Sequence, residues 1–257
     1  MGLFGGLFDK KVCDLCGGEI GLLGNRKLED GNCCKQCAAK LSPWFSDRRK
    51  STVQQIREQL EYREENLEEV KAFHTTRTIA ADNWNILLDE GARKMILTRN
   101  PRGIETENPD VISLSDVTGC SVNIDESVDE IMREVKQGDE TKKVSYHPAR
   151  YSHDYQFDYL INVNNPYFDD MKFRLNRSTV TIEPVIAGTM FDPMLKPEYA
   201  RYQNIANEIT AALTGKGAQA AEEPACAPRV VICPYCKVET EVGASGRCEY
   251  CGGYIAE

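Results

Sequence analysis

Long apolar runs are missing from this sequence of 257 residues. No stretch approaches the ~20 consecutive apolar residues that span a bilayer, and no secretory signal of the usual charged, apolar and small-residue order is present. We therefore expect a cytoplasmic protein. Residues 1–11 form an apolar tail, in which Leu3, Phe4, Leu7 and Phe8 would share one face of a short helix. Such a face allows docking on a membrane surface without crossing it.

Catalytic motifs are also scarce. The sequence has no Gly-rich Walker loop and no nucleophile elbow. Its histidines are limited to His74, His147 and His153, and the last two fall in the Tyr-rich stretch 146–155, which we expect to be a solvent-facing loop. No nucleophile accompanies them. The sequence therefore predicts a protein that is not an enzyme and has no catalytic or organic-cofactor site.

Positive charge is in deficit, because 31 Lys and Arg face 40 Asp and Glu and the net charge is −9. In the first 50 residues, Arg26-Lys27 and residues 48–50 are locally basic. Nonspecific affinity for nucleic acid comes largely from neutralising phosphates. A nucleic-acid-associated regulatory zinc protein is therefore a minor alternative.

Cysteine, by contrast, is plentiful, with eleven residues. Eight of them form two quartets of paired C-x2-C motifs: Cys13, Cys16, Cys34 and Cys37 near one end, and Cys233, Cys236, Cys248 and Cys251 near the other. Four thiolates close a tetrahedron around Zn²⁺ and leave no position for water or substrate, which is typical of structural zinc. We expect two Zn²⁺ ions per chain. Four thiolates also accept iron, and disulfides or free thiols are the other readings.

Three cysteines lie outside the quartets: Cys33, Cys120 and Cys226. Unpaired thiols persist most easily in a reducing compartment, which agrees with a cytoplasmic location. Cys33 could compete with Cys34 as a ligand, although its spacing to Cys37 fits less well.

The first quartet organises a module at residues 12–45. Asp30-Gly31 predicts a positive-φ hairpin turn between the cysteine pairs, and residues 35–41 favour a helix that Pro43 ends. The C-x2-C-G start, the centre Gly21-Leu22-Leu23-Gly24 with Arg26-Lys27-Leu28, and the Lys40-Leu41-Ser42-Pro43 end resemble a small bacterial zinc-finger family of unknown function. That resemblance implies a treble-clef-like fold with zinc on the four cysteines, and no activity.

Residues 46–72 predict a charged amphipathic helix. Ser51 and Gln54 form a capping-box pattern at its start. Apolar side chains then occupy heptad a and d positions, interrupted at one d position by Arg63: Val53, Ile56, Leu60, Leu67 and Val70. The stripe allows packing on the protein's own domain or a weak homodimer through residues 51–72.

Residues 73–214 are long enough for a sizeable core. Apolar runs bounded by turn residues predict strands near residue 79 and at 83–88, 94–98, 111–114, 117–124, 155–163, 171–175 and 180–182. Helical spacing predicts one closing helix at 198–213. Antiparallel strands with a helix indicate an α+β fold. The element order, with Ile86-Leu87-Leu88-Asp89-Glu90 and residues 112–117, resembles bacterial pleckstrin-homology-like domains. The resemblance implies a partly open barrel that binds proteins, peptides or sometimes lipids, and it names no site residue.

The remaining residues divide into a small, polar linker at 215–229 and a module at 230–257 whose cysteine pairs resemble a short zinc ribbon. A module of this size is too small for an ordinary core, so we expect it to need bound metal in order to fold. The layout predicts a zinc-binding adaptor or scaffold with unidentified protein partners. A peripheral membrane-surface protein, docked through the apolar tail and the middle domain, is the main alternative.

Overall fold

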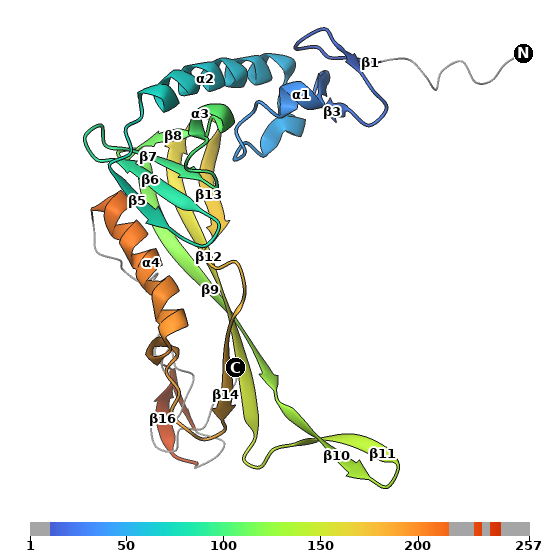
Figure 1. Cartoon of the computed structure of the whole chain (residues 1–257), viewed down its shortest axis with the longest axis vertical. Coiled ribbons are helices and arrows are strands. Elements are labelled where there is room, and N and C mark those ends of the chain that lie inside the picture. The colour runs from blue at the N-terminus through green and yellow to red at the C-terminus, as the bar shows by residue number, and fades with distance from the viewer. Residues whose placement is uncertain (1–10, 216–228, 233–236, 243–257) are drawn as a thin grey trace, which may run out of the picture. The chain divides into compact units, whose positions relative to one another are not determined.

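A computed structural model describes residues 11–215, 229–232 and 237–242. The chain divides into two compact units, Met1–Ala218 and Gln219–Glu257. Its elements are helices and antiparallel strands (Figure 1), so the fold is α+β, as the sequence predicts. No helix in the described ranges combines the length and apolar character needed to cross a membrane.

The first unit begins with two short hairpins. Strand β1 (Lys11–Val12) pairs with β2 (Glu19–Ile20), and β3 (Asn25–Lys27) pairs with β4 (Asn32–Cys34). Helix α1 (Lys35–Ala38) follows directly and ends before the predicted stop at Pro43. The positive-φ turn predicted at Asp30-Gly31 is wrong, because Gly31 does not have a positive φ. Gly31 is needed for space instead: a Cβ there would lie 2.6 Å from Val53 Cγ2.

A short 3-10 turn, η1 (Asp47–Lys50), leads into helix α2 (Val53–Ala72). The capping box is formed by Thr52 and Gln55, one residue later than predicted. Ser51 is not the cap, because its hydroxyl donates to the Asp47 carbonyl at 3.0 Å. The face that α2 buries holds more polar than apolar side chains: Ile56, Gln59, Arg63, Asn66 and Val70.

The first large sheet is an antiparallel meander in the order β5-β6-β7-β8. Its strands are β5 (Arg77–Ala80), β6 (Asn85–Asp89), β7 (Lys94–Thr98) and β8 (Val111–Ser113), with the short helix α3 (Ile104–Glu107) between the last two. These strands confirm the apolar-run predictions for residues 79–114. Helix α2 lies across the end of this sheet near α3 and β8 (Figure 1).

The second large sheet is built on β12 (Arg150–Asn165). Strand β9 (Val117–Glu130) pairs along one side of β12, and β13 (Phe168–Arg174) and β14 (Val180–Ile186) follow each other along the other side. Every second residue of β12 is buried over the core: Tyr155, Phe157, Tyr159, Ile161 and Val163. The structure thus confirms the strand predicted at 155–163.

Beyond the core, β9 and β12 continue as a ribbon toward a further hairpin, β10 (Met132–Gln137) with β11 (Glu140–Ser145) (Figure 1). The sequence did not predict this hairpin, and none of its residues is buried. The loop expected at 146–155 is wrong for its second half, because β12 starts at Arg150. His153 therefore lies in a strand, with Nδ1 2.6 Å from Glu126 Oε1.

After the 3-10 turn η2 (Pro193–Leu195), helix α4 (Pro197–Thr214) closes the domain and confirms the predicted helix. Tyr202, Ala206 and Ile209 are buried in the main core. The Tyr159 and Thr210 hydroxyls lie 2.6 Å apart and join β12 to α4. In the second unit, β15 (Arg229–Ile232) pairs with β16 (Glu239–Val242).

Candidate metal centre

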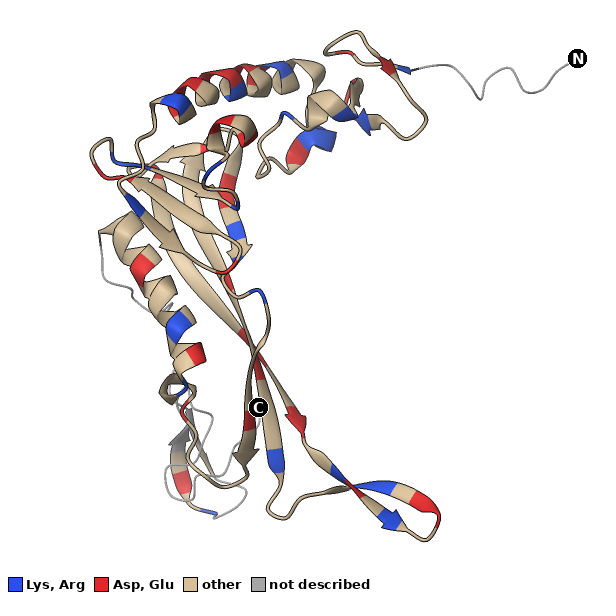
Figure 2. Cartoon of the chain, viewed as in Figure 1, with Lys and Arg blue, Asp and Glu red and all other residues tan. Residues whose placement is uncertain are grey.

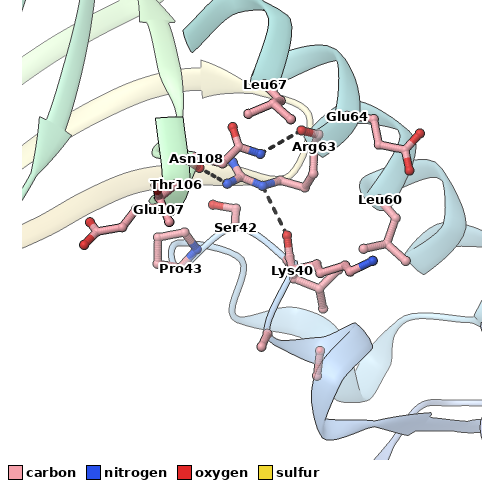
Figure 3. Close-up of a pocket in the computed structure, with 13 residues that line it drawn as sticks. Lys40, Ser42, Pro43, Leu60, Arg63, Glu64, Leu67, Thr106, Glu107 and Asn108 are labelled. Atoms are coloured by element: carbon pink, nitrogen blue, oxygen red, sulfur yellow. Dashed lines mark hydrogen bonds between the residues drawn. The ribbon is translucent and has the colours of Figure 1, made fainter. Parts of the chain in front are cut away.

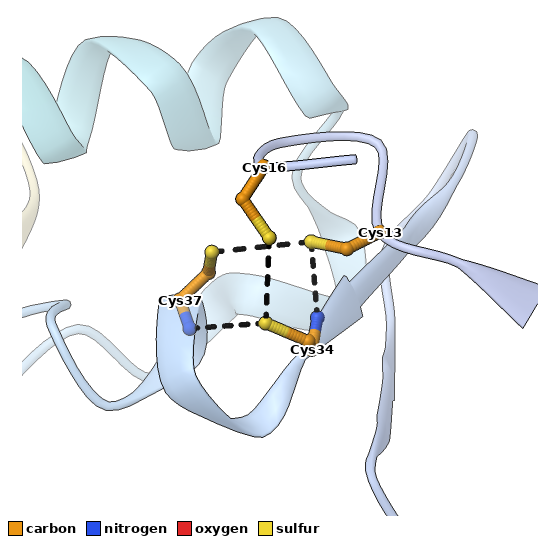
Figure 4. A group of neighbouring side chains, drawn as sticks. All are labelled: Cys13, Cys16, Cys34 and Cys37. Atoms are coloured by element: carbon orange, nitrogen blue, oxygen red, sulfur yellow. Dashed lines mark hydrogen bonds between the residues drawn. The ribbon is translucent and has the colours of Figure 1, made fainter. Parts of the chain in front are cut away.

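Four cysteines of the first unit converge from two backbone turns (Figure 4). Cys13 and Cys16 flank the turn after β1, which the Gly17 amide closes by donating to the Cys13 carbonyl at 2.8 Å. Gly17 has a φ of 72°, a conformation that glycine adopts without steric cost. Cys34 ends β4 and caps α1, and Cys37 lies within that helix. Strand and helix together therefore place the second pair opposite the first.

The sulfur positions fit a tetrahedral metal site. Cys13 Sγ lies 3.9 Å from Cys37 Sγ, and Cys16 Sγ lies 3.9 Å from Cys34 Sγ. All four sulfurs are within 4.8 Å of one another. A regular tetrahedron with metal–sulfur bonds of ~2.3 Å has edges of ~3.8 Å. The tetrad is thus positioned to bind one metal ion, and in the described part of the chain no other group of metal-ligating side chains is found.

Backbone amides prepare these sulfurs to carry charge. The Cys34 amide donates to Cys13 Sγ, and the Cys37 amide donates to Cys34 Sγ, both at 3.3 Å. Burial acts to raise the Cys13 pKa, but hydrogen bonds, chiefly from the Cys16 and Cys34 amides, outweigh it and lower this pKa to about 6. The Cys37 pKa is raised by burial and by the neighbouring cysteines. A bound metal cation would favour the thiolate form of all four cysteines.

Cys33 is not part of the tetrad. Its thiol is completely buried and lies 3.3 Å from the Cys34 carbonyl oxygen. Burial, with the nearby Cys13 and Cys34, raises the Cys33 pKa to about 12. The structure therefore brings Cys34 to the metal position and leaves Cys33 as a core side chain beneath it. Cys120 lies elsewhere, half-buried on β9.

The second predicted quartet and Cys226 lie outside the described residues. Of the second unit, the structure describes residues 229–232 and 237–242, which contain β15 and β16 and flank Cys233 and Cys236 in the sequence. One metal site is therefore supported by geometry, and the second stays a prediction. The apolar tail residues Leu3, Phe4, Leu7 and Phe8 also lie outside the described part of the chain.

The metal-binding module shares its core with α2. Ile56 is completely buried in the same cluster as Leu28, Cys33 and Leu41. On the next turns of α2, Arg63 Nη1 donates to Asp110 Oδ1 at 2.7 Å, and Ser42 Oγ donates to Asp110 Oδ2 at 2.9 Å. In the sequence, Arg63 is recognisable only as an interruption of the apolar stripe.

We call the metal-binding module at residues 12–45 the finger. A cavity of about 710 Å³ lies beside this network, between the end of the finger, α2 and α3 (Figure 3). Its wall combines Leu60 and Leu67 of α2 with Pro43 of the finger. Arg63 also lines it and donates to the Lys40 carbonyl at 3.3 Å and to the Asn108 carbonyl. Finger, helix and sheet thus meet through a buried polar contact that lies next to an open cavity.

Comparison with known proteins gives one partial match. A family described as a domain of unknown function (DUF4428) matches residues 11–59. This span contains the whole cysteine tetrad and ends within α2, just past Ile56 in the finger core. The match agrees with the resemblance to a zinc-finger-like family of unknown function. No curated protein and no solved structure matches the chain.

Proposed function

We propose that this protein is a cytoplasmic, non-enzymatic adaptor whose N-terminal finger is held in shape by Zn²⁺. The observation that carries the proposal is the closed set of four thiol ligands at Cys13, Cys16, Cys34 and Cys37. A catalytic zinc keeps one position for water or substrate, whereas four sulfurs complete the coordination of a structural ion. The ion would supply folding free energy to a module whose own core is small.

The binding role is supported by the way the finger is joined to the sheets. Ser42 and Arg63 both contact Asp110, so the finger, α2 and the first sheet present a connected surface. The strand order also supports a pleckstrin-homology-like middle domain. A four-stranded meander is followed by the antiparallel strands β9, β12 and β13 and by a closing helix, the order that the sequence resemblance implies.

Charge favours protein partners over nucleic acid. Figure 2 shows Lys and Arg interspersed with Asp and Glu along the chain, and α2 carries charges of both signs along its length. A duplex or single strand needs a basic stripe to gain its phosphate contacts. The second cysteine quartet would form a separate zinc ribbon. The linker at 215–229 would hold this ribbon near a partner bound to the rest of the chain, and the raised effective concentration of the ribbon would allow a further weak contact.

Elemental analysis of protein purified without added metal tests the zinc part of this proposal. About two zinc ions per chain are expected if both quartets bind, and about one if only the N-terminal tetrad does. Cys34→Ala should lose one ion, because three thiols hold zinc poorly. Cys33→Ala is the matched control and should keep the wild-type content. Iron in place of zinc, or equal metal loss in both variants, would contradict the assignment.

The adaptor part is tested by capture of partners on the immobilised full chain. Wild type and Cys33→Ala should retain the same protein, and Cys34→Ala should retain less of it, since its finger loses metal. Retention that is identical for all three chains would show that the finger surface is not used. A substrate turned over by the purified protein would contradict the non-enzymatic assignment.

A further inference from the structure

The first unit also has a basic pocket, which shares no residue with the metal centre. A cavity of about 410 Å³ is bordered by the β5–β6 turn, the end of β7 and strands β12 and β13. Its charged lining consists of one carboxylate, Asp158, and four cations: Arg99, Lys172, Arg174 and Arg177. This excess of positive charge is local, because the whole chain has a net charge of −9.

The carboxylate is already engaged. Asp158 accepts hydrogen bonds from Arg174 Nε at 2.8 Å and Arg174 Nη2 at 3.4 Å, and Lys172 Nζ lies 3.6 Å away. Asp158 thus holds Arg174 in a fixed orientation at the wall of the pocket. In the described part of the chain, neither Arg99 nor Arg177 pairs with a carboxylate. Two guanidinium groups therefore remain available to an anion.

Arg99 is held through its side chain and Arg177 through its backbone. The Arg99 guanidinium carbon lies 4.4 Å from the centre of the Trp84 ring, a cation–π contact that restrains this side chain. The Arg177 amide donates to Asp82 Oδ2 at 2.8 Å. Next to it, buried Asn176 accepts from the Phe157 amide and donates to the Ser178 carbonyl. Fixed backbone on one side and a stacked ring on the other reduce the ordering cost of binding.

The chemistry of the lining selects the ligand. Guanidinium groups present forked N–H donors that match the oxygens of phosphate groups. Trp84 offers no free face for a nucleobase, because Arg99 covers it and its ring also packs against Trp44 at 5.8 Å and Phe173 at 5.7 Å. We propose that this pocket binds a phosphate-bearing anion through Arg99 and Arg177. The phosphate would come from a free polyphosphate or from a lipid headgroup. This inference goes beyond the adaptor role and does not depend on the metal.

Calorimetric titration of the full, metal-loaded chain with inorganic pyrophosphate at low salt tests the site. We expect saturable binding at one site. The double change Arg99→Gln with Arg177→Gln should weaken it by about tenfold or more, because two charge-assisted contacts are removed. Arg102→Gln removes the same kind of charge from an exposed turn that does not line the pocket, and it should leave the affinity within about twofold.

Vesicles separate the two sources of phosphate. If the wild-type chain sediments with phosphatidylcholine vesicles that contain phosphatidic acid, and the double variant does not, the ligand is a lipid headgroup. Pyrophosphate binding without vesicle binding would assign a soluble phosphate compound. Either result supports the site when Arg102→Gln behaves as wild type. Absence of saturable pyrophosphate binding, equal binding by the double variant, or binding only of an acidic peptide would overturn the proposal. Circular dichroism and zinc content check that each variant is folded.

Discussion

Arg63 on α2 and Asp110 before β8 form a buried ion pair, with Nη1 2.7 Å from Oδ1 and side chains that are 6% and 0% exposed. They are separated by 47 residues in the sequence. Ser42 of the finger completes the contact by donating to the second carboxylate oxygen. A single carboxylate therefore joins the finger, the long helix and the first sheet.

Breaking this pair should be costly. Arg63→Met leaves the Asp110 carboxylate buried without its cation, and we expect a loss of about 3–5 kcal/mol in the free energy of unfolding. Lys71→Met is the matched control, because Lys71 pairs with Glu68 on the exposed face of the same helix and should change stability by less than about 1 kcal/mol. Urea unfolding at neutral pH measures both.

The double variant Arg63→Met with Asp110→Asn distinguishes charge from shape. It removes the unpaired charge, so it should recover part of the stability lost in Arg63→Met. Equal losses in Arg63→Met and Lys71→Met would mean that the pair does not hold the finger to the sheet.

The sequence shows Arg63 but not its partner. A charged residue at a heptad d position is visible as a break in the apolar stripe, whereas the sequence Asn108-Pro109-Asp110 predicts only a chain reversal. Pairing across 47 residues depends on how helix and sheet pack, which local patterns do not encode. The cysteine tetrad was predictable for the opposite reason, because metal geometry restricts the spacing of each ligand pair.

Gly31 provides a second test of how closely α2 approaches the finger. A Cβ at this position would lie 2.6 Å from Val53 Cγ2 and 2.7 Å from Asp14 Oδ2. Gly31→Ala should therefore lower stability by about 1–3 kcal/mol through overpacking. Gly21→Ala, where no atom lies within 4 Å of the added Cβ, should be neutral or slightly stabilising.

Thermal unfolding of the two alanine variants compares them directly. Val53→Ala in the Gly31→Ala background should recover part of the loss, since it removes one of the two clashing groups. Identical midpoints for Gly31→Ala and Gly21→Ala would show that the helix can shift without cost.

The core part of the second sheet was predictable, and the ribbon was not. Burial on one face forces the alternation of Tyr155, Phe157, Tyr159 and Ile161, and this pattern identifies the strand. Residues 125–130 read Asp-Glu-Ser-Val-Asp-Glu and have no such face. They are extended because they pair with residues 151–156 of β12, not because a core selects them. Periodicity cannot detect a strand whose two faces are both polar.

Asp82 follows β5 and contacts α4, and the ionisation of its carboxylate should make the stability of the fold depend on pH. Its carboxylate accepts from the Tyr202 hydroxyl at 2.6 Å, from Arg201 Nη2 at 3.0 Å and from the Arg177 amide at 2.8 Å. Partial burial acts to raise the Asp82 pKa, but these three donors outweigh it and hold the pKa below its ordinary value. The charged form is therefore favoured in the folded state, and its contribution to stability is complete above the unfolded pKa of about 3.9.

That contribution should be lost as the pH falls through the lowered folded-state pKa. At pH 7 we expect Asp82→Asn to lower the free energy of unfolding by about 1–2 kcal/mol, because an amide has one neutral acceptor oxygen where the carboxylate has two charged ones. Toward pH 2 the difference from wild type should shrink, since wild-type Asp82 becomes protonated. Asp139→Asn, on the exposed β10–β11 turn, is the control and should match wild type at both pH values. A difference between wild type and Asp82→Asn that stays constant with pH would mean that shape, and not charge, makes Asp82 stabilising.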